Sequence, residues 1–363
     1  MISHQQLFGS NEPEVDHSII HNNELPTAAI FPANIYSHYY NTIPTMDELV
    51  DNIVSINITA IGDCTLGNDS RFLYKTSFNY KYDQCDDNGY NWFFSDVRPI
   101  FEQDDLTIAN LEGVLTSRQK KAPKKYSDNT FHFRGRPEYA LMLKEGGVDA
   151  LNLANNHSLD YMIDGYNDTV KNLDENGLVS FDEDRTPILL LKGVSIGLLG
   201  FNEVNHTNEG KSISELKKKV ETDIRNIKGK ADITVVSFHW GEEKSTLPNQ
   251  NQIELGRAAI DAGADLVLGH HPHVIQPIEK YRGKYIVYSL GNFCYGGHPN
   301  PDDKDTLIFQ QTFLVNKEID WLGTNEPIIY PCSISSTYLY NDYKPTLLNY
   351  NESVRLTERI INK

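Results

Sequence analysis

Five short apolar runs in this chain end in the same way, because each is followed at once by carboxylate, amide or imidazole side chains. The five junctions are Ile61 before Gly62-Asp63, Ala109 before Asn110-Leu111-Glu112, Leu153 before Ala154-Asn155-Asn156-His157, Phe238 before His239-Trp240-Gly241, and Leu268 before Gly269-His270-His271-Pro272-His273. Short apolar runs of this kind are typical of buried strands. Amphipathic, helix-like patterns separate them along the chain, so the sequence predicts a layered α/β fold.

The remaining elements follow from periodicity and from capping residues. Strands are expected at residues 55–61, 106–109, 150–153, 188–191, 195–199, 233–238, 266–268, 285–290, 306–309 and 328–330. Helices are expected at residues 92–101, 137–145, 165–175, 252–262 and 352–361. Ser212 and Glu215 form a capping-box pattern ahead of a charged helix that ends near Lys228. The runs at 188–191 and 195–199 predict a hairpin, because Lys192-Gly193 separates them.

The first fifty residues differ from the rest of the chain. Residues 1–50 are polar, contain four prolines and have no lasting periodicity, so we expect an irregular N-terminal extension. No repeat or convincing linker follows, and residues 51–363 are expected to form one domain. No apolar run approaches the 18 residues of a membrane span, and Met1 does not begin a signal-peptide pattern.

Charge and cysteine content exclude several classes of protein. A formal charge of −17 argues against nucleic-acid binding and against docking on an anionic membrane, since both need clustered Lys and Arg. It does not constrain a small metal-filled pocket, where the ions dominate the local field. The four cysteines, Cys64, Cys85, Cys294 and Cys332, form no CxxC pair, so zinc-ribbon and thioredoxin-like sites are excluded. The spacing leaves one or two disulfides open.

Three histidines follow Leu268 within five residues and are the first sign of a functional site. Pro272 stiffens the turn, which allows His271 and His273 to converge on one point. A histidine-rich surface turn is the ordinary alternative. Each of the other polar junctions also has one: a turn or helix cap, a solvated carboxylate, a tight turn of asparagines, or a packed histidine.

The junctions are more informative together than separately. Ligands of open α/β sheets bind beyond the carboxyl ends of strands, so these side chains are expected to gather at one edge. The set is Asp63, Glu112, Asn156, His157, His239, His271 and His273. Hard oxygen ligands mixed with imidazoles suit Mn, Fe or Zn, so the sequence predicts one or two divalent ions. A carboxylate can bridge two such ions about 3.5–4 Å apart, the arrangement of two-metal phosphoryl chemistry.

These motifs, taken in order, resemble those of a known family. The chain contains Gly62-Asp63-Cys64-Thr65-Leu66-Gly67, Asn110-Leu111-Glu112-Gly113, Asn155-Asn156-His157-Ser158-Leu159-Asp160, His239-Trp240-Gly241-Glu242, Gly269-His270-His271-Pro272-His273 and Tyr288-Ser289-Leu290-Gly291-Asn292-Phe293. Together they look like the bacterial capsule-synthesis family of CapA and PgsA, the poly-γ-glutamate capsule proteins. That family resembles the calcineurin-like metallophosphoesterases, which implies mixed β-sheets flanked by helices. The resemblance covers residues from about 55 to the C-terminus.

The resemblance also implies roles for individual residues. Asp63 is similar to the first metal carboxylate and Glu112 to the bridging acid, while Asn156, His239, His271 and His273 match the amide and imidazole ligands. His157 resembles the histidine that protonates the leaving group, and Asp160 would orient it.

Three positions depart from the family pattern. Thr65 stands where classical metallophosphoesterases have a histidine, and Glu112 where they have an aspartate. Both changes would weaken one metal position and leave a mononuclear or poorly occupied site. Met162 replaces a glycine of many relatives, which would reshape the loop behind His157.

The densest basic run, Arg118 to Lys125, has two interpretations. As an anion-collecting arm it would bind substrate through Lys120, Lys121, Lys124 and Lys125, with help from Arg134. The alternative is a solvated, mobile loop.

The sequence favours a metal-dependent, phosphoesterase-like hydrolase that serves the biosynthesis or export of a capsule polymer such as poly-γ-glutamate. Its partners would be an anionic polymer or a phosphate ester, together with membrane-bound capsule synthesis proteins. Two alternatives stay open: a non-catalytic, metal-containing scaffold, and an amide hydrolase that trims polyglutamate. The resemblance implies an extracytoplasmic location at the cell envelope.

Overall fold

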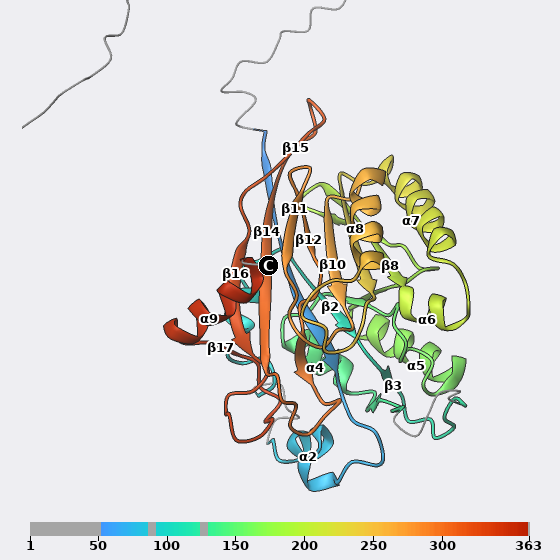
Figure 1. Cartoon of the computed structure of the whole chain (residues 1–363), viewed down its shortest axis with the longest axis vertical. Coiled ribbons are helices and arrows are strands. Elements are labelled where there is room, and N and C mark those ends of the chain that lie inside the picture. Colours follow the sequence, from blue (N-terminus) through green and yellow to red (C-terminus); the bar gives the residue numbers. More distant parts are fainter. Residues whose placement is uncertain (1–51, 86–91, 124–129, 362–363) are drawn as a thin grey trace, which may run out of the picture. The chain divides into compact units, whose positions relative to one another are not determined.

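The long first strand, β1 (Val54–Thr65), is the centre of the larger of two main sheets in the computed structural model (Figure 1), which describes residues 52–85, 92–123 and 130–361. The strands of this sheet lie in the order β17 (Thr346–Leu347), β16 (Ile328–Ser333), β14 (Asp305–Asn316), β1, β2 (Leu106–Leu111), β5 (Ala150–Asn152) and β6 (Val179–Phe181). In addition, β13 (Asn292–Tyr295) pairs with β1, and β15 (Trp321–Thr324) pairs with β14. Pairing is parallel from β1 through β6 and antiparallel between β1 and β14, so the sheet is mixed.

The second sheet supplies the other half of the core. Its order is β11 (Ile278–Tyr281), β12 (Lys284–Val287), β10 (Leu266–His270), β9 (Ile233–His239), β8 (Val194–Asn202) and β7 (Ile188–Leu191). The strands β12, β10, β9 and β8 are parallel, and β7 and β11 close the two edges as hairpin partners. A short third pair joins β3 (Val114–Leu115) to β4 (Arg134–Gly135).

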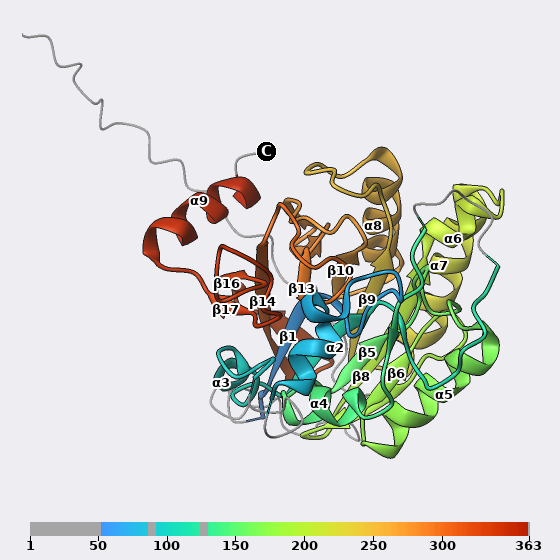
Figure 2. The same ribbon diagram turned by 90° about the horizontal axis from the view of Figure 1, so that it is seen from below.

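Helices cover the outer faces of both sheets, except that Leu356 and Ile360 of the last helix belong to the buried cluster between the sheets. The helices are α2 (Phe78–Asp83), α3 (Arg98–Phe101), α4 (Tyr139–Glu145), α5 (Met162–Glu175), α6 (Glu203–Asn208), α7 (Ile213–Lys228), α8 (Gln250–Ala262) and α9 (Tyr350–Ile361), with a 3₁₀ turn at Tyr74–Thr76. Figures 1 and 2 both place α7 and α8 on the side of the molecule that carries β8 and β10. None of the helices in the described ranges combines the length and the apolar character needed to cross a membrane.

Alternation along the strands produces the layers, because successive side chains of a strand point to opposite faces. Ile58 of β1 and Leu268 of β10 belong to one buried cluster between the two sheets. Val267, the neighbour of Leu268 in β10, belongs to an outer cluster with residues of α7 and α8. Ile61, farther along β1, belongs to a second outer cluster with residues of α4 and α5. The predicted layered α/β fold with mixed sheets flanked by helices is confirmed.

Most predicted elements are present, but several boundaries were wrong. The strand predicted to stop before Gly62 continues as β1 to Thr65, and β10 continues to His270, because both polar ends pair with neighbouring strands. Only residues 98–101 of the helix predicted at 92–101 are helical. Pro99 explains this, since proline has no N–H and is tolerated only in a first turn. The helix expected from Gly165 begins at Met162.

Other predictions fared differently. The capping box of Ser212 and Glu215 is present at α7, and the hairpin at Lys192-Gly193 is confirmed. The helix α6 and the strands β11 and β13 were not predicted from the sequence. All four cysteines are free, and the N-terminal extension expected at residues 1–50 lies outside the described residues.

Candidate metal centre

The predicted site residues lie together where strands of both sheets end. Asp63 lies near the C-terminal end of β1, Glu112 directly follows β2, and His239 is the last residue of β9. Asn156 and His157 follow β5, and the two histidines of the Pro272 turn follow β10. Parallel strands carry all of these positions to one edge, as expected from the sequence.

Glu112 is at the centre of this group and is fully buried. Its Oε2 accepts a hydrogen bond from Thr65 Oγ1 at 3.2 Å. Its Oε1 has no hydrogen-bond partner in the described structure, although three imidazoles surround it. The Nε2 atoms of His157, His239 and His273 lie 3.8, 3.7 and 3.7 Å from this oxygen. Burial raises the pKa of Glu112 above its usual range.

Asp63 is also fully buried, but its carboxylate is well supplied with donors. Asn110 Nδ2 donates to Oδ1 at 2.8 Å, and the backbone N–H of His271 donates to Oδ2 at 3.2 Å. His270 Nδ1 and His273 Nδ1 lie 3.4 and 3.3 Å from the two oxygens. Burial disfavours the charged carboxylate, but His270 and His273 outweigh it and lower the pKa of Asp63 well below its usual value.

The turn after β10 has a strained backbone. His271 has φ 95° and His273 has φ 59°, both in the left-handed region that non-glycine residues rarely adopt. Such conformations cost free energy and cluster at functional sites. Gly269 is required just before them, because a Cβ there would lie 2.0 Å from the carbonyl oxygen of Tyr288.

The two histidines of this turn have opposite electrostatic surroundings. Burial lowers the pKa of His271 to about 3, and its Nδ1 has no hydrogen-bond partner in the described structure. Burial also opposes the charged form of His273, but the carboxylates of Glu112 and Asp63 outweigh it and raise the pKa to about 10. Asn292 Oδ1 lies 2.9 Å from His273 Nδ1, which orients the ring with Nε2 toward Glu112.

His239 and Asn156 are engaged with each other. His239 Nε2 lies 2.8 Å from Asn156 Oδ1, and His239 Nδ1 lies 3.4 Å from Asn110 Nδ2. Burial lowers the pKa of His239 well below its usual value, so the ring is neutral. Both residues are at the site, but each would have to exchange this bond to ligate an ion.

His157 and Asp160 form the predicted pair. His157 Nδ1 lies 2.7 Å from Asp160 Oδ2, which fixes the ring so that Nε2 faces Glu112. The same carboxylate oxygen accepts the backbone N–H of Phe133 at 2.6 Å. The Phe133 ring packs on the imidazole with the ring centroids 4.5 Å apart.

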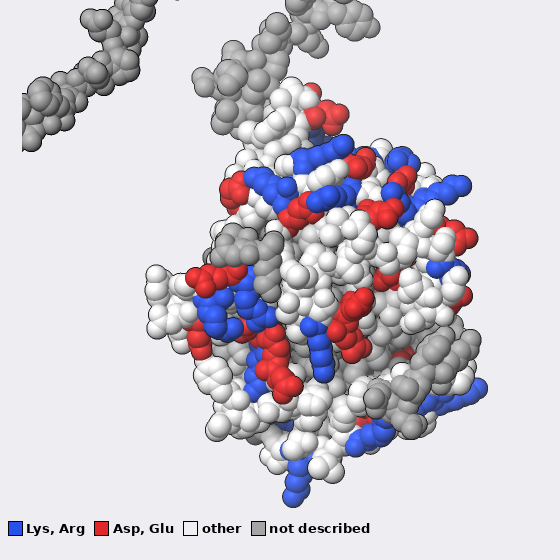
Figure 3. Space-filling view, in the orientation of Figure 1, with Lys and Arg blue, Asp and Glu red and all other residues white. Residues whose placement is uncertain are grey.

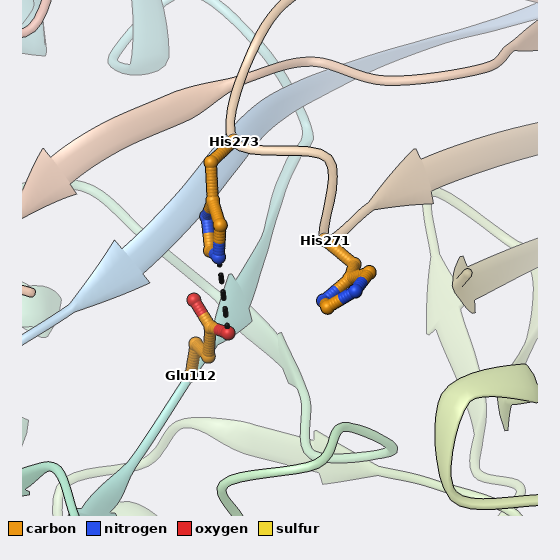
Figure 4. A group of neighbouring side chains, drawn as sticks. All are labelled: Glu112, His271 and His273. Carbon is orange, nitrogen blue, oxygen red and sulfur yellow. Dashed lines mark ion pairs between the residues drawn. The ribbon is translucent and has the colours of Figure 1, made fainter. Parts of the chain in front are cut away.

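A divalent ion fits a subset of these residues. Glu112, His271 and His273 each offer a ligand atom, and these atoms lie within 4.8 Å of one another. Figure 4 shows the carboxylate of Glu112 and the ring of His273 pointing toward each other, with His271 beside them on the same turn. The buried oxygen of Glu112 and the buried Nδ1 of His271 both need a partner, which an ion would supply. One carboxylate and two imidazoles suit Mn, Fe or Zn.

A cavity of about 510 Å³ opens beside this group. Its described lining includes Asn156, His157, His273, Asn292, Phe131, Phe133, Tyr295, Glu243, Lys244 and Asp302. Two of the described residues predicted to bind substrate do not line it: Lys121 Nζ donates to Ser70 Oγ, and Arg134 donates to the carbonyl oxygen of Arg118. Lys120 is likewise absent from the lining, and Lys124 and Lys125 lie outside the described residues.

Four residues that contact or border the site had no role predicted from the sequence. Asn110 bonds Asp63 and approaches His239, Asn292 holds His273, His270 approaches Asp63, and Lys244 lines the cavity. Asn110 and Asn292 belong to the motifs that carry the resemblance, so a signal for them was present. Nothing local marks Lys244, which reaches the cavity only through the loop between β9 and α8.

Comparison with known proteins agrees with the sequence motifs. The sequence model of the family described as bacterial capsule synthesis protein PGA_cap matches residues 57–296. The PGA biosynthesis protein CapA of Bacillus subtilis is 34% identical over 270 residues, which cover 69% of this chain and 66% of that protein. The capsule biosynthesis protein CapA of Bacillus anthracis is 33% identical over 257 residues, covering 66% and 60%. The chain thus spans a little less than two thirds of the length of either relative.

Solved structures with similar folds are more distant. The calcineurin-like phosphoesterase YfkN of Bacillus subtilis matches with a TM-score of 0.47 and 15% identity, covering 85% of this chain and 96% of that one. A phosphatase of Mycoplasma pneumoniae matches with a TM-score of 0.44 and 14% identity, covering 77% and 94%. Both likenesses are partial, and nothing about the activity of this chain follows from them.

Proposed function

The chain belongs to the bacterial capsule synthesis protein family PGA_cap, and from this membership and the geometry of its site we propose that it is a divalent-metal-dependent hydrolase of the phosphoesterase type. The observation that carries the proposal is the buried Oε1 of Glu112, which has no hydrogen-bond partner among the described residues, lies at ion-pair distance from three imidazoles and is next to the His157–Asp160 pair. Buried polar atoms without partners are rare in proteins unless a ligand or a catalytic role accounts for them.

Glu112, His271 and His273 would hold the ion, with Asp63, Asn156 and His239 as further candidate ligands. An ion of this kind, when bound, supplies Lewis-acid stabilisation of negative charge and makes water more acidic. Asn292 and Asp63 keep His273 in one orientation, which preserves its Nε2 as a ligand.

His157 would supply the proton for the leaving oxygen. Asp160 accepts the Nδ1 proton, so Nε2 is the ring atom available to the cavity, and the Phe133 ring excludes water from one face of the imidazole. A general acid held in one orientation this way contributes about 10²–10⁴ to the rate of such reactions. The substrate would be a phosphate ester or an anionic polymer linked through one.

The test is turnover of phosphate esters by the parent and by His157→Gln, each loaded with Mn or Zn. We expect kcat to fall about 10²–10⁴-fold in the variant, while the metal content of both proteins stays equal. Glu138→Gln, on the exposed surface at the start of α4, is the control and should keep full activity. A parent that holds metal but turns over no phosphate ester would contradict the proposal.

A non-catalytic, metal-containing scaffold is the second candidate, and one contact favours it. Thr65 donates to Glu112 Oε2, so this carboxylate has only one oxygen without a partner. This restricts its use as a bridge between two ions. The scaffold would bind metal at the same residues and show no turnover for His157→Gln to abolish. Shortening of polyglutamate without action on phosphate esters would instead indicate the amide hydrolase.

The family is linked to capsule and poly-γ-glutamate synthesis. We propose that this chain acts in that process at the cell envelope, together with membrane-bound synthesis proteins. Fractionation of cells that express the full-length protein, followed by detection with an antibody, would test the location.

A further inference from the structure

One lysine lines the cavity beside the candidate metal centre, together with the histidines His157, His273 and His298 and the acidic residues Glu243, Asp302 and Asp303. Lys244 shares this lining with His157 and His273, and no arginine or second lysine among the described residues contributes to it. On the face seen in Figure 3, acidic and basic side chains are intermingled. An anionic substrate that enters this cavity therefore meets Lys244.

The backbone of Lys244 is fixed to the turn that carries the candidate ligands. Its N–H donates to the carbonyl oxygen of Pro272 at 2.7 Å, and its φ of 63° is in the left-handed region. This conformation costs a non-glycine residue about 1 kcal/mol or more of conformational free energy. Gln276 Nε2 donates to the carbonyl oxygens of Ser245 and Leu247 at 2.9 and 3.1 Å, so the rest of the loop is held as well.

The Lys244 side chain also differs from the other basic groups near the site. Arg118 pairs with Asp168, and the guanidinium of Arg134 lies over the ring of Tyr161. In the described part of the chain, no carboxylate is within ion-pair distance of Lys244. An unpaired ammonium presents three donors and a compact charge, which suits a phosphoryl group.

We propose that Lys244 recognises the phosphate group of the substrate, the role that the sequence suggested for residues 120–125. This inference rests on the proposed function and specifies which side of the cavity holds the anionic group. Glu243 lines the same cavity next to Lys244. The two residues therefore act on a bound anion with opposite sign, and neutralising each should change affinity in opposite directions.

The test is calorimetric titration of inorganic phosphate into the full chain loaded with Mn, with metal content measured in parallel. Lys244→Gln should weaken phosphate binding about tenfold, the low end of the range for hydrogen bonds to charged groups. Glu243→Gln should strengthen it about twofold, as expected for an exposed charge. Lys171→Gln is the matched control and should leave the affinity unchanged, because the ammonium of Lys171 pairs with Glu175 on the exposed surface of α5.

The outcomes separate this inference from the proposed function. A parent that binds Mn and phosphate, with unchanged affinity in Lys244→Gln, overturns the role of Lys244 and leaves the hydrolase proposal standing. Changes of the same sign in Lys244→Gln and Glu243→Gln would reflect a disturbed loop and also overturn it. A parent that holds Mn and does not bind phosphate overturns both the role of Lys244 and the phosphoesterase proposal.

Discussion

The two ends of strand β10 differ in whether their buried polar groups have hydrogen-bond partners. Before its first residue, Asp265 is buried and accepts from Lys228 Nζ at 2.9 Å, from the backbone N–H of Thr234 at 2.9 Å and from Lys284. After its last residue, the buried Nδ1 of His271 has no partner among the described residues. The first end pairs its buried carboxylate, whereas the second leaves a buried polar atom without a hydrogen-bond partner among the described residues, as expected at the proposed metal site.

The backbone shows the same contrast. The left-handed position before β10 is Gly263 at the end of α8, with φ 119°, where glycine has no Cβ penalty. The left-handed positions after β10 are His271 and His273, which do pay that penalty. Residues that would relieve the strain would also remove the two imidazoles. Under the proposed function, this edge of the fold gives up stability so that two candidate metal ligands take up their positions.

The largest expected effect is on metal binding at the histidine end. Glu112→Gln keeps the shape of the side chain and removes the charged oxygen, so we expect metal affinity to fall about 100-fold or more. Stability should stay equal or rise, because a buried carboxylate is replaced by a neutral amide. Elemental analysis and urea denaturation measure the two effects, with Glu145→Gln at the exposed end of α4 as control. Full metal content in Glu112→Gln would remove the contrast between the two ends.

The next effect is on stability at the opposite end. Asp265→Asn loses both lysine partners and weakens the bond from Thr234, so we expect the free energy of unfolding to fall by about 2–3 kcal/mol. The value is below that of a fully buried pair, because both lysine side chains are partly exposed, at 38% and 31%. Metal content should not change.

The matched control for this variant is Asp261→Asn. Asp261 pairs with Arg282 on the surface, and the expected change there is below about 0.5 kcal/mol. Equal urea midpoints for the two variants would show that the buried pair does not stabilise this end of β10.

The smallest effect concerns backbone strain behind His157. Met162 has φ 63° at the start of α5, which explains why glycine suits this position. Met162→Gly and Met162→Ala lose the same half-buried side chain, but only glycine relieves the backbone. We expect the glycine variant to be about 1 kcal/mol more stable than the alanine variant in thermal or urea unfolding. Equal stability would mean that this edge of the fold stores no strain at Met162.

How much the sequence predicted depends on the range of the contacts involved. The strands, the capping box of α7 and the turn after α8 were found because their signals are local: alternation, caps and a glycine. The meeting of Asp63, Glu112, His239 and the two histidines was predictable as well. The carboxyl ends of parallel strands lie at one edge of the sheet, so a short motif after each strand is sufficient to predict that these side chains meet.

Other features required the tertiary structure. The ends of β1 and β10 depend on pairing with other strands, and the φ values of His271 and His273 depend on how the turn closes against Asp63 and Asn292. The bond between His239 and Asn156 joins residues 83 positions apart. Lys244 lines the cavity because the loop from β9 to α8 folds onto Pro272, whereas the described lysines of the basic run, Lys120 and Lys121, do not line it. The sequence by itself determined which chemistry gathers at this edge, because that information is local to each strand. Only the tertiary structure decided which donors are already paired and which are free for a ligand, because pairing depends on distances between segments remote in the chain.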